Sequence, residues 1–168
     1  SAVDVLNDLL NYDKIEMGTL RMEFSAVPIW EVVKSATIGF LTPAKHKGVH
    51  LSLCNNLEIE NSLDGKSDRP QPVVVGDCAR LAQVVRNLIS NALKFTPENG
   101  QIEINVERVC GGLPNPSLVL SSESVHLLEQ PRAGSVRISV TDSGVGLTVE
   151  QLAQICTEGI QFNANELQ

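Results

Sequence analysis

The clearest pattern along this chain is an apolar stretch, residues 79–94, that is crossed by one narrow polar stripe. The stripe recurs every three or four residues, as a helix requires, and consists of Arg80, Gln83, Asn87, Asn91 and Lys94. Because so apolar a helix should be mostly buried, the amides and the ammonium group of the stripe need polar partners. We therefore expect this helix to meet a polar ligand, with a phosphate and its metal ion as the best candidate.

Alternation of apolar and polar residues predicts the strands. It is clean at 102–106 and 136–140, and a short apolar run at 73–75 predicts a buried strand. Residues 49–53 and 20–24 alternate in the same way. Between the strands at 102–106 and 136–140, residues 110–134 are rich in Gly, Pro and Ser, and we expect a long surface loop there.

Capping residues and prolines predict where the helices begin and end. Asp77 is the expected N-cap of the helix with the polar stripe. A second helix is expected over 28–42, with Pro28 in its first turn and Pro43 as its limit. A short helix should begin at the capping box of Thr148 and Gln151 and end near Ile155.

Composition narrows the class of protein. The 168 residues, 42% of them hydrophobic, suffice for one domain with a real core, and the net charge of −7 disfavours binding to nucleic acid. No apolar run approaches the roughly 20 residues that span a bilayer. Four dispersed cysteines without a Cys-x-x-Cys pair argue against zinc ligation and disulfides, and indicate a reducing compartment. Because the chain begins at Ser1 inside an amphipathic pattern, we expect it to be a fragment.

The first candidate site is the C-terminal part of the stripe, Asn87, Asn91 and Lys94, followed by Phe95 and Thr96. Asn87 and Asn91 lie one helical turn apart and point the same way, although asparagine is a poor helix former. They are either structural amides bonded to neighbouring loops or part of a site for a cation and a polyphosphate. Mg²⁺ prefers oxygen ligands and keeps several waters, so one or two amides would suffice, with Lys94 as a point charge.

The second candidate site is Asp142-Ser143-Gly144-Val145-Gly146, at the end of the strand 136–140. Gly144 and Gly146 let the backbone turn sharply or approach a flat ligand, and Asp142 could accept a hydrogen bond from an exocyclic amine such as that of adenine. The alternative is an ordinary turn from strand to helix, because Asp-Ser-Gly is common turn chemistry. The sequence has neither a Rossmann fingerprint nor a Walker A motif.

Together the two motifs closely resemble the ATPase domain of sensor histidine kinases, a Bergerat-fold domain whose GHKL superfamily includes DNA gyrase, the chaperone Hsp90 and MutL. Residues 76–88 resemble the lead-in to the family's N box, and 142–146 resemble its G1 box. Residues 5–24 resemble the end of the second dimerisation helix and its exit. The resemblance implies an α/β two-layer sandwich with a mixed sheet packed on helices. It assigns 1–24 to a partial dimerisation region and 25–168 to the ATP-binding catalytic domain.

The resemblance also implies roles on the phosphate side of an ATP site. Asn91 would hold Mg²⁺, Asn87 would assist it or contact phosphate, and Lys94 would contact phosphate. In gyrase-like relatives a Glu near the position of Asn87 activates water for hydrolysis. Because an asparagine cannot act as a base, transfer of phosphate to a histidine fits this chain better than hydrolysis does.

On the base side, the resemblance implies that Phe95 lines the nucleotide pocket and that Asp142 contacts the adenine amine, directly and through water. Gly144 and Gly146 would let the loop pass beside the base.

Two departures from the family pattern define what the chain lacks. The chain has three histidines, His46, His50 and His126. None lies in the sequence context of the family's phosphoacceptor histidine, so no catalytic residue is expected within the chain. The family's second glycine box, which closes the lid over the phosphates, is expected after Gln168, while Phe162 resembles the F-box phenylalanine. The chain should therefore hold the adenine and Mg²⁺ halves of the site and be inactive by itself.

We thus predict the ATP-Mg²⁺-binding domain of a protein histidine kinase, which transfers the γ-phosphoryl group of ATP to a histidine in two-component signalling. The implied partners are a dimerisation domain, in a homodimer, and a response-regulator receiver. Residues 158–168 suggest a hybrid kinase with a phosphorelay. The domain would be cytoplasmic, in a parent protein that can be membrane-anchored. The alternatives are a non-catalytic nucleotide-binding or interaction module, and a gyrase- or Hsp90-like ATPase, which Asn87 and residues 5–24 disfavour.

Overall fold

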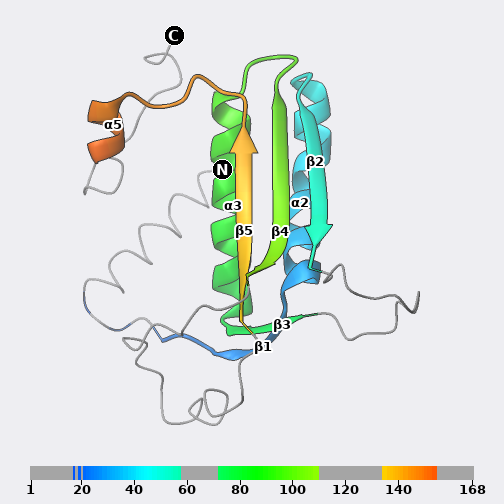
Figure 1. Cartoon of the computed structure of the whole chain (residues 1–168), viewed down its shortest axis with the longest axis vertical. Helices are drawn as coiled ribbons and strands as arrows, with labels where there is room; N and C mark the ends of the chain where they lie inside the picture. The colour runs from blue at the N-terminus through cyan, green and yellow to red at the C-terminus, as the bar shows by residue number, and fades with distance from the viewer. Residues whose placement is uncertain (1–16, 18, 20, 58–71, 110–133, 155–168) are drawn as a thin grey trace.

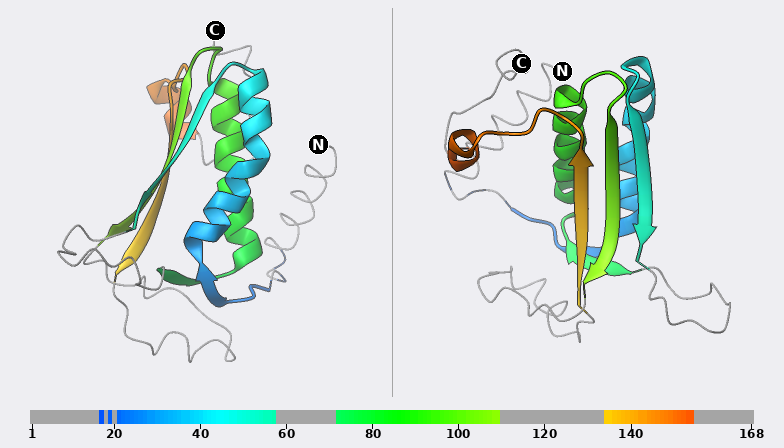
Figure 2. Two further views of the ribbon diagram at one scale, coloured as in Figure 1. Left: turned by 90° about the vertical axis from the view of Figure 1, so that its right-hand side faces the viewer. Right: turned by 45° about the horizontal axis from the view of Figure 1, so that its top comes forward.

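Two helices lie side by side on one face of a three-stranded sheet (Figures 1 and 2). The computed structural model describes residues 17, 19, 21–57, 72–109 and 134–154, and the predictions for residues 1–15, for most of 110–134 and for 155–168 lie outside them. The sheet has the order β2 (His50–Asn56), β4 (Gln101–Val109), β5 (Ser135–Asp142). The helices are α2 (Ile29–His46) and α3 (Cys78–Phe95).

The direction of the strands makes this sheet mixed. Strand β2 pairs with β4 in parallel, and β4 pairs with β5 antiparallel, with Ile102 opposite Asp142. The parallel pair is joined through β3 and α3, as a crossover connection requires. The predicted two-layer α/β sandwich with a mixed sheet is therefore confirmed.

A second, two-stranded sheet lies where both helices begin (Figure 1). It pairs β1 (Ser25–Pro28) with β3 (Val73–Gly76) in antiparallel fashion. The prediction that 73–75 is buried was wrong, because Val73 and Val75 are 56% and 40% exposed on this small sheet. The strand expected at 20–24 was also misplaced, because pairing with β3 begins only at Ser25.

The core fills the space between the helices and one face of the large sheet. Its most deeply buried members come from α2, α3 and β4, at the spacings of helices and strands: Ile29, Val33, Val85, Ile89, Ile104 and Val106. Burial of each such side chain stabilises the fold by about 1.5–3 kcal/mol.

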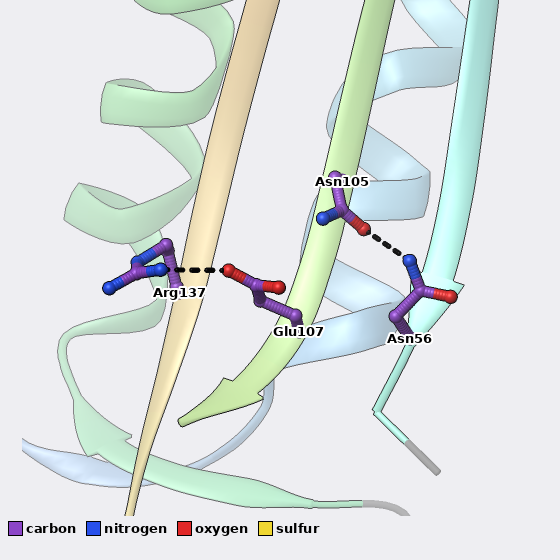
Figure 3. A network of polar contacts seen from close by, with 4 residues as sticks. All are labelled: Asn56, Asn105, Glu107 and Arg137. Carbon is purple, nitrogen blue, oxygen red and sulfur yellow. Dashed lines mark hydrogen bonds and ion pairs between the residues drawn. The ribbon is translucent and has the colours of Figure 1, made fainter. Parts of the chain in front are cut away.

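The opposite face of the sheet carries polar pairs between neighbouring strands (Figure 3). Arg137 Nη1 lies 3.1 Å from Glu107 Oε1, and Asn56 Nδ2 donates to Asn105 Oδ1 at 2.8 Å. One apolar and one polar face suit a sheet that α2 and α3 cover on one side, and the side view in Figure 2 shows these two helices together on the same side of the strands.

The ends of the helices agree with the capping signals except at Pro43. Helix α2 continues through Pro43 to His46, so Pro43 does not limit it as predicted. A proline in the last turn removes a single helical hydrogen bond, and the backbone bonds after Pro43 complete the end of the helix. The last short helix, α5 (Val149–Gln154), begins with the predicted capping box: Thr148 N donates to Gln151 Oε1, and Gln151 N donates to Thr148 Oγ1. Over the described ranges, no helix is long and apolar enough to cross a membrane.

Candidate functional site

Helix α3, which carries the first candidate motif, begins after Asp77, the residue that caps it. As predicted for an N-cap, Asp77 Oδ1 accepts a hydrogen bond from Arg80 N at 3.1 Å, and Oδ2 also accepts one from Glu23 N at 3.0 Å. Burial raises the pKa of Asp77, but hydrogen bonds from backbone N–H groups and the charge of Arg80 outweigh it, so the pKa lies below its ordinary value. The carboxylate thus ties the segment before β1 to the start of α3.

The polar stripe of α3 lies on the solvent-exposed face of the helix. Asn87, Asn91 and Lys94 are all exposed, whereas the buried face is formed by Val85, Ile89 and Ala92. Our expectation that the helix is mostly buried was therefore wrong, because the sheet and α2 cover only one side of it. Water satisfies the exposed amides, so their desolvation cannot be the evidence for a ligand.

The side chains of Asn87 and Asn91 are available to a ligand. Among the described residues, neither the side chain of Asn87 nor that of Asn91 has a hydrogen-bond partner, so the interpretation as structural amides bonded to neighbouring loops finds no support there. Arg80 Nη1, in contrast, donates to Gln83 Oε1 at 3.1 Å, which occupies the first two members of the stripe with each other. Arg80 and Gln83 are therefore bonded to each other, whereas the side chains of Asn87 and Asn91 remain available to a ligand.

The stripe reaches the end of α3 with Lys94, the residue before Phe95. Helix α3 ends at Phe95, and buried Thr96 follows it, with its hydroxyl donating to Ala92 O at 2.7 Å. The ammonium group of Lys94 lies 4.9 Å from the centre of the Phe95 ring. A cation and a half-buried aromatic ring thus lie beside each other one turn beyond Asn91.

The loop after β5 is held in shape by its own side chains. Asp142 Oδ1 accepts a hydrogen bond from Gly144 N at 2.8 Å, and no other bond to the carboxylate exists among the described residues. Ser143 binds the start of β4 twice, because its N–H donates to Gln101 O and its Oγ accepts from Gln101 N, at 3.0 and 2.8 Å. Gly146 has a φ of 71°, in the left-handed region that favours glycine. Ser143 thus has the turn-forming role that Asp-Ser-Gly predicts, although its two bonds to Gln101 could not be read from the sequence.

The two candidate motifs meet at Gly144. A Cβ atom on this residue would lie 2.8 Å from the carbonyl oxygen of Phe95 and 2.6 Å from Asp142 Oδ1. Such distances are shorter than real contacts, so only glycine lets the Asp142 loop lie against the end of α3. The structure therefore brings together Asp142 and Gly144 from one motif with Lys94 and Phe95 from the other.

The residues present suit a cation that is shared with a ligand rather than a self-contained metal site. Among the described residues, no three His, Cys, Asp or Glu side chains gather at a point where they could hold a metal ion. Asn87 and Asn91 offer amide oxygens, which are hard ligands of the kind that Mg²⁺ accepts alongside water and phosphate. These two residues would hold the ion only weakly without a phosphate ligand.

A separate groove of about 690 Å³ lies between α2 and α3. Its lining includes Val32, Ala36, Cys78, Ala82 and Arg86, and none of the predicted site residues. Because nothing in this groove matches the two motifs, we place the candidate site at the end of α3 instead.

Comparison with protein families and known proteins shows which family the chain resembles. The family described as histidine kinase-, DNA gyrase B-, and HSP90-like ATPase matches residues 76–165. The signal transduction histidine-protein kinase BarA of Escherichia coli (strain K12) is 31% identical over 143 residues, which are 85% of this chain and 12% of BarA. The non-motile and phage-resistance protein of Caulobacter vibrioides is 27% identical over 152 residues, 90% of this chain and 14% of that protein. The chain thus spans only a small part of these relatives.

Solved structures show the same fold. The nucleotide-free catalytic domain of histidine kinase ThkA has a TM-score of 0.59 at 21% identity, over 86% of this chain and 74% of that one. Full-length ShkA in complex with AMPPNP has a TM-score of 0.61 at 20% identity, over 89% of this chain and 25% of that one.

Proposed function

The chain belongs to the family of histidine kinase-, DNA gyrase B- and HSP90-like ATPases, and on this premise we propose that it binds ATP with Mg²⁺ as part of a protein histidine kinase. The observation that carries the proposal is the contact of Gly144 with the Phe95 carbonyl. It joins a motif suited to an adenine amine with a motif suited to phosphates. ATP would lie between the exposed face of α3 and the loop after Asp142.

On the base side, Asp142 accepts a hydrogen bond from the adenine amine. One carboxylate oxygen is occupied by Gly144 N, which fixes the side chain and leaves the other oxygen for the ligand. Phe95 lines the pocket, and Gly146, which has open space around it, lets the loop pass beside the base. Fixing the acceptor before the ligand binds lowers the entropy lost on binding.

On the phosphate side, Asn91 and Asn87 would hold Mg²⁺, which would neutralise phosphate charge. Lys94 adds a positive charge one turn further along the same exposed face. The exposure of this face supports the proposal, because a polyphosphate and a hydrated cation could not reach buried amides. The structurally similar ShkA was solved in complex with AMPPNP, an ATP analogue.

Phosphate transfer to a histidine is the reaction that we propose for the intact protein. Asn87 provides no general base for water, so this chain positions ATP and neutralises charge rather than activating a nucleophile. Relatives such as BarA carry the name histidine-protein kinase. For the whole protein, we also propose an acceptor histidine, a lid over the phosphates and a hybrid arrangement with a receiver domain.

The proposed partners are a dimerisation region, to which we assign residues 1–24, and a response regulator. We propose that the intact kinase is a homodimer and that this domain, residues 25–168, works in the cytoplasm. Histidine kinase ThkA has been solved in complex with the response regulator TrrA, with a TM-score of 0.58 at 20% identity over 95% of this chain and 38% of that one.

An NMR titration of the chain with ATP tests the site, because it detects even millimolar binding. With Mg²⁺ present, Asn91→Ala should weaken ATP binding about tenfold or more, since a contact to a charged group is lost. The same variant should bind adenosine like the parent. Asp142→Ala should weaken both ligands, and Ser90→Ala, an exposed neighbour on α3, should weaken neither. Equal ATP affinity of Asn91→Ala, Asp142→Ala and the parent would show that the site has been misassigned.

A further inference from the structure

A lysine outside both motifs binds the end of α3. The ammonium group of Lys47, in the turn between α2 and β2, donates to the carbonyl oxygens of Leu93 and Lys94 at 2.7 and 3.1 Å. Sequence analysis gave Lys47 no role. No signal in its own neighbourhood along the chain could have shown this contact, because its partners lie 46 and 47 residues away.

The carbonyl group of Leu93 needs a donor because of Pro97. In a continuing helix, the carbonyl of Leu93 would accept a hydrogen bond from the N–H of residue 97, but a proline has none. The helix turns away after Thr96, whose own N–H bonds to Ala92 O. Lys47 therefore supplies the donor that Pro97 cannot provide.

The backbone of Lys47 is itself held in place. The turn after α2 is closed by bonds from Gly48 N to Lys45 O and from Val49 N to Ala44 O, with Gly48 at a φ of 69°. The same turn is tied to the turn after α3, because Asn99 N donates to Gly48 O. The side chain thus extends from a fixed base to a fixed target.

We propose that Lys47 is a positioning residue for the phosphate side of the nucleotide site, an inference that rests on the proposed function. It holds the last turn of α3, from which Lys94 extends and against whose Phe95 carbonyl Gly144 packs. It also compensates the partial negative charge that the free carbonyls of a helix C-terminus carry. Without Lys47, the negative charge of these carbonyls would lie uncompensated beside Lys94, and the spacing between the two motifs would loosen.

The test compares Lys47→Met with Lys47→Arg, and uses Lys45→Met as the control. Lys45 is an exposed lysine of the last turn of α2, so the control removes the same charge close by without touching α3. The measurements are NMR titrations with ATP-Mg²⁺ and with adenosine, and amide hydrogen exchange at residues 93–101 without nucleotide. We expect Lys47→Met to bind ATP-Mg²⁺ about three- to tenfold more weakly and to exchange faster. Adenosine affinity should change less, Lys47→Arg should restore most of the ATP affinity, and Lys45→Met should match the parent.

The inference is overturned if Lys47→Met binds ATP-Mg²⁺ as the parent does, or if Lys45→Met weakens binding equally, since the effect would then come from net charge alone. If the parent itself does not bind ATP-Mg²⁺ while Lys47→Met still exchanges faster at the end of α3, the proposed function has failed. Lys47 would in that case be only a helix cap, which also overturns its role in binding.

Discussion

Gly144→Ala should push apart the two halves of the proposed nucleotide site. The added methyl group would lie 2.8 Å from the Phe95 carbonyl oxygen, 3.1 Å from its carbon and 2.6 Å from Asp142 Oδ1. The carboxylate can rotate, but the backbone at the end of α3 cannot yield easily, because Lys47 and buried Thr96 hold it. The loop must therefore move by several tenths of an ångström or more. Overpacking of this kind destabilises proteins by about 1–3 kcal/mol.

Binding should suffer as well as stability. A misplacement of about 1 Å in a preorganised active site can lower the reaction rate by about two orders of magnitude. For the smaller demand of binding, we expect ATP affinity to fall at least about tenfold. Urea unfolding gives the change in the free energy of unfolding, and an NMR titration gives the affinity.

Gly39→Ala is the matched control, because a Cβ atom on Gly39 meets nothing within 4 Å. Replacing glycine by alanine inside a helix should stabilise the protein by up to about 1 kcal/mol and leave ATP affinity unchanged. If Gly144→Ala matched the parent in both unfolding and binding, the contact with Phe95 could not be what joins the two motifs.

Two further predictions concern charged groups. Because the folded-state pKa of Asp77 is lowered, its ionised carboxylate stabilises the fold above its unfolded pKa, and this contribution is lost as the pH falls through the folded value. In urea unfolding between pH 5 and about pH 3, the free energy of unfolding should therefore fall more for the parent than for Asp77→Asn. An equal fall in both proteins would contradict the assigned hydrogen bonds. The Arg137–Glu107 pair is 63% and 34% exposed, so Arg137→Ala should change the free energy of unfolding by less than about 0.5 kcal/mol, whereas a larger loss would mean that solvent screens the pair less than we infer.

The secondary structure was largely predictable, because its signals are local. Asp77 caps α3 as its side chain predicts, and alternation in β4 places Ile102, Ile104 and Val106 on the buried face. The errors fell where pairing with another segment decides the outcome. Val73 and Val75 looked like core residues, but their strand pairs with β1 in the small sheet, where both side chains are exposed.

The candidate site was predictable only through the combination of its two motifs. Each motif alone allowed an ordinary structural interpretation, and the physical argument from the buried stripe was wrong, since Asn87 and Asn91 are exposed. The residue types were nevertheless informative, because they suit a cation, a phosphate and an adenine amine together. The match of the ATPase family over residues 76–165 agrees with that combination.

The sequence by itself thus determined the helices, most of the strands and the chemistry of the two motifs, because periodicity, caps and turn residues act within a few positions of the chain. Only the tertiary structure decided which face of α3 the sheet covers and why Gly144 must lack a side chain. It also decided which group donates the hydrogen bond that Pro97 cannot donate at the end of α3. Those outcomes depend on contacts of Phe95 with Gly144 and of Leu93 with Lys47, between segments that are distant along the chain. Close packing and hydrogen-bond geometry between such segments arise only once the layers have come together.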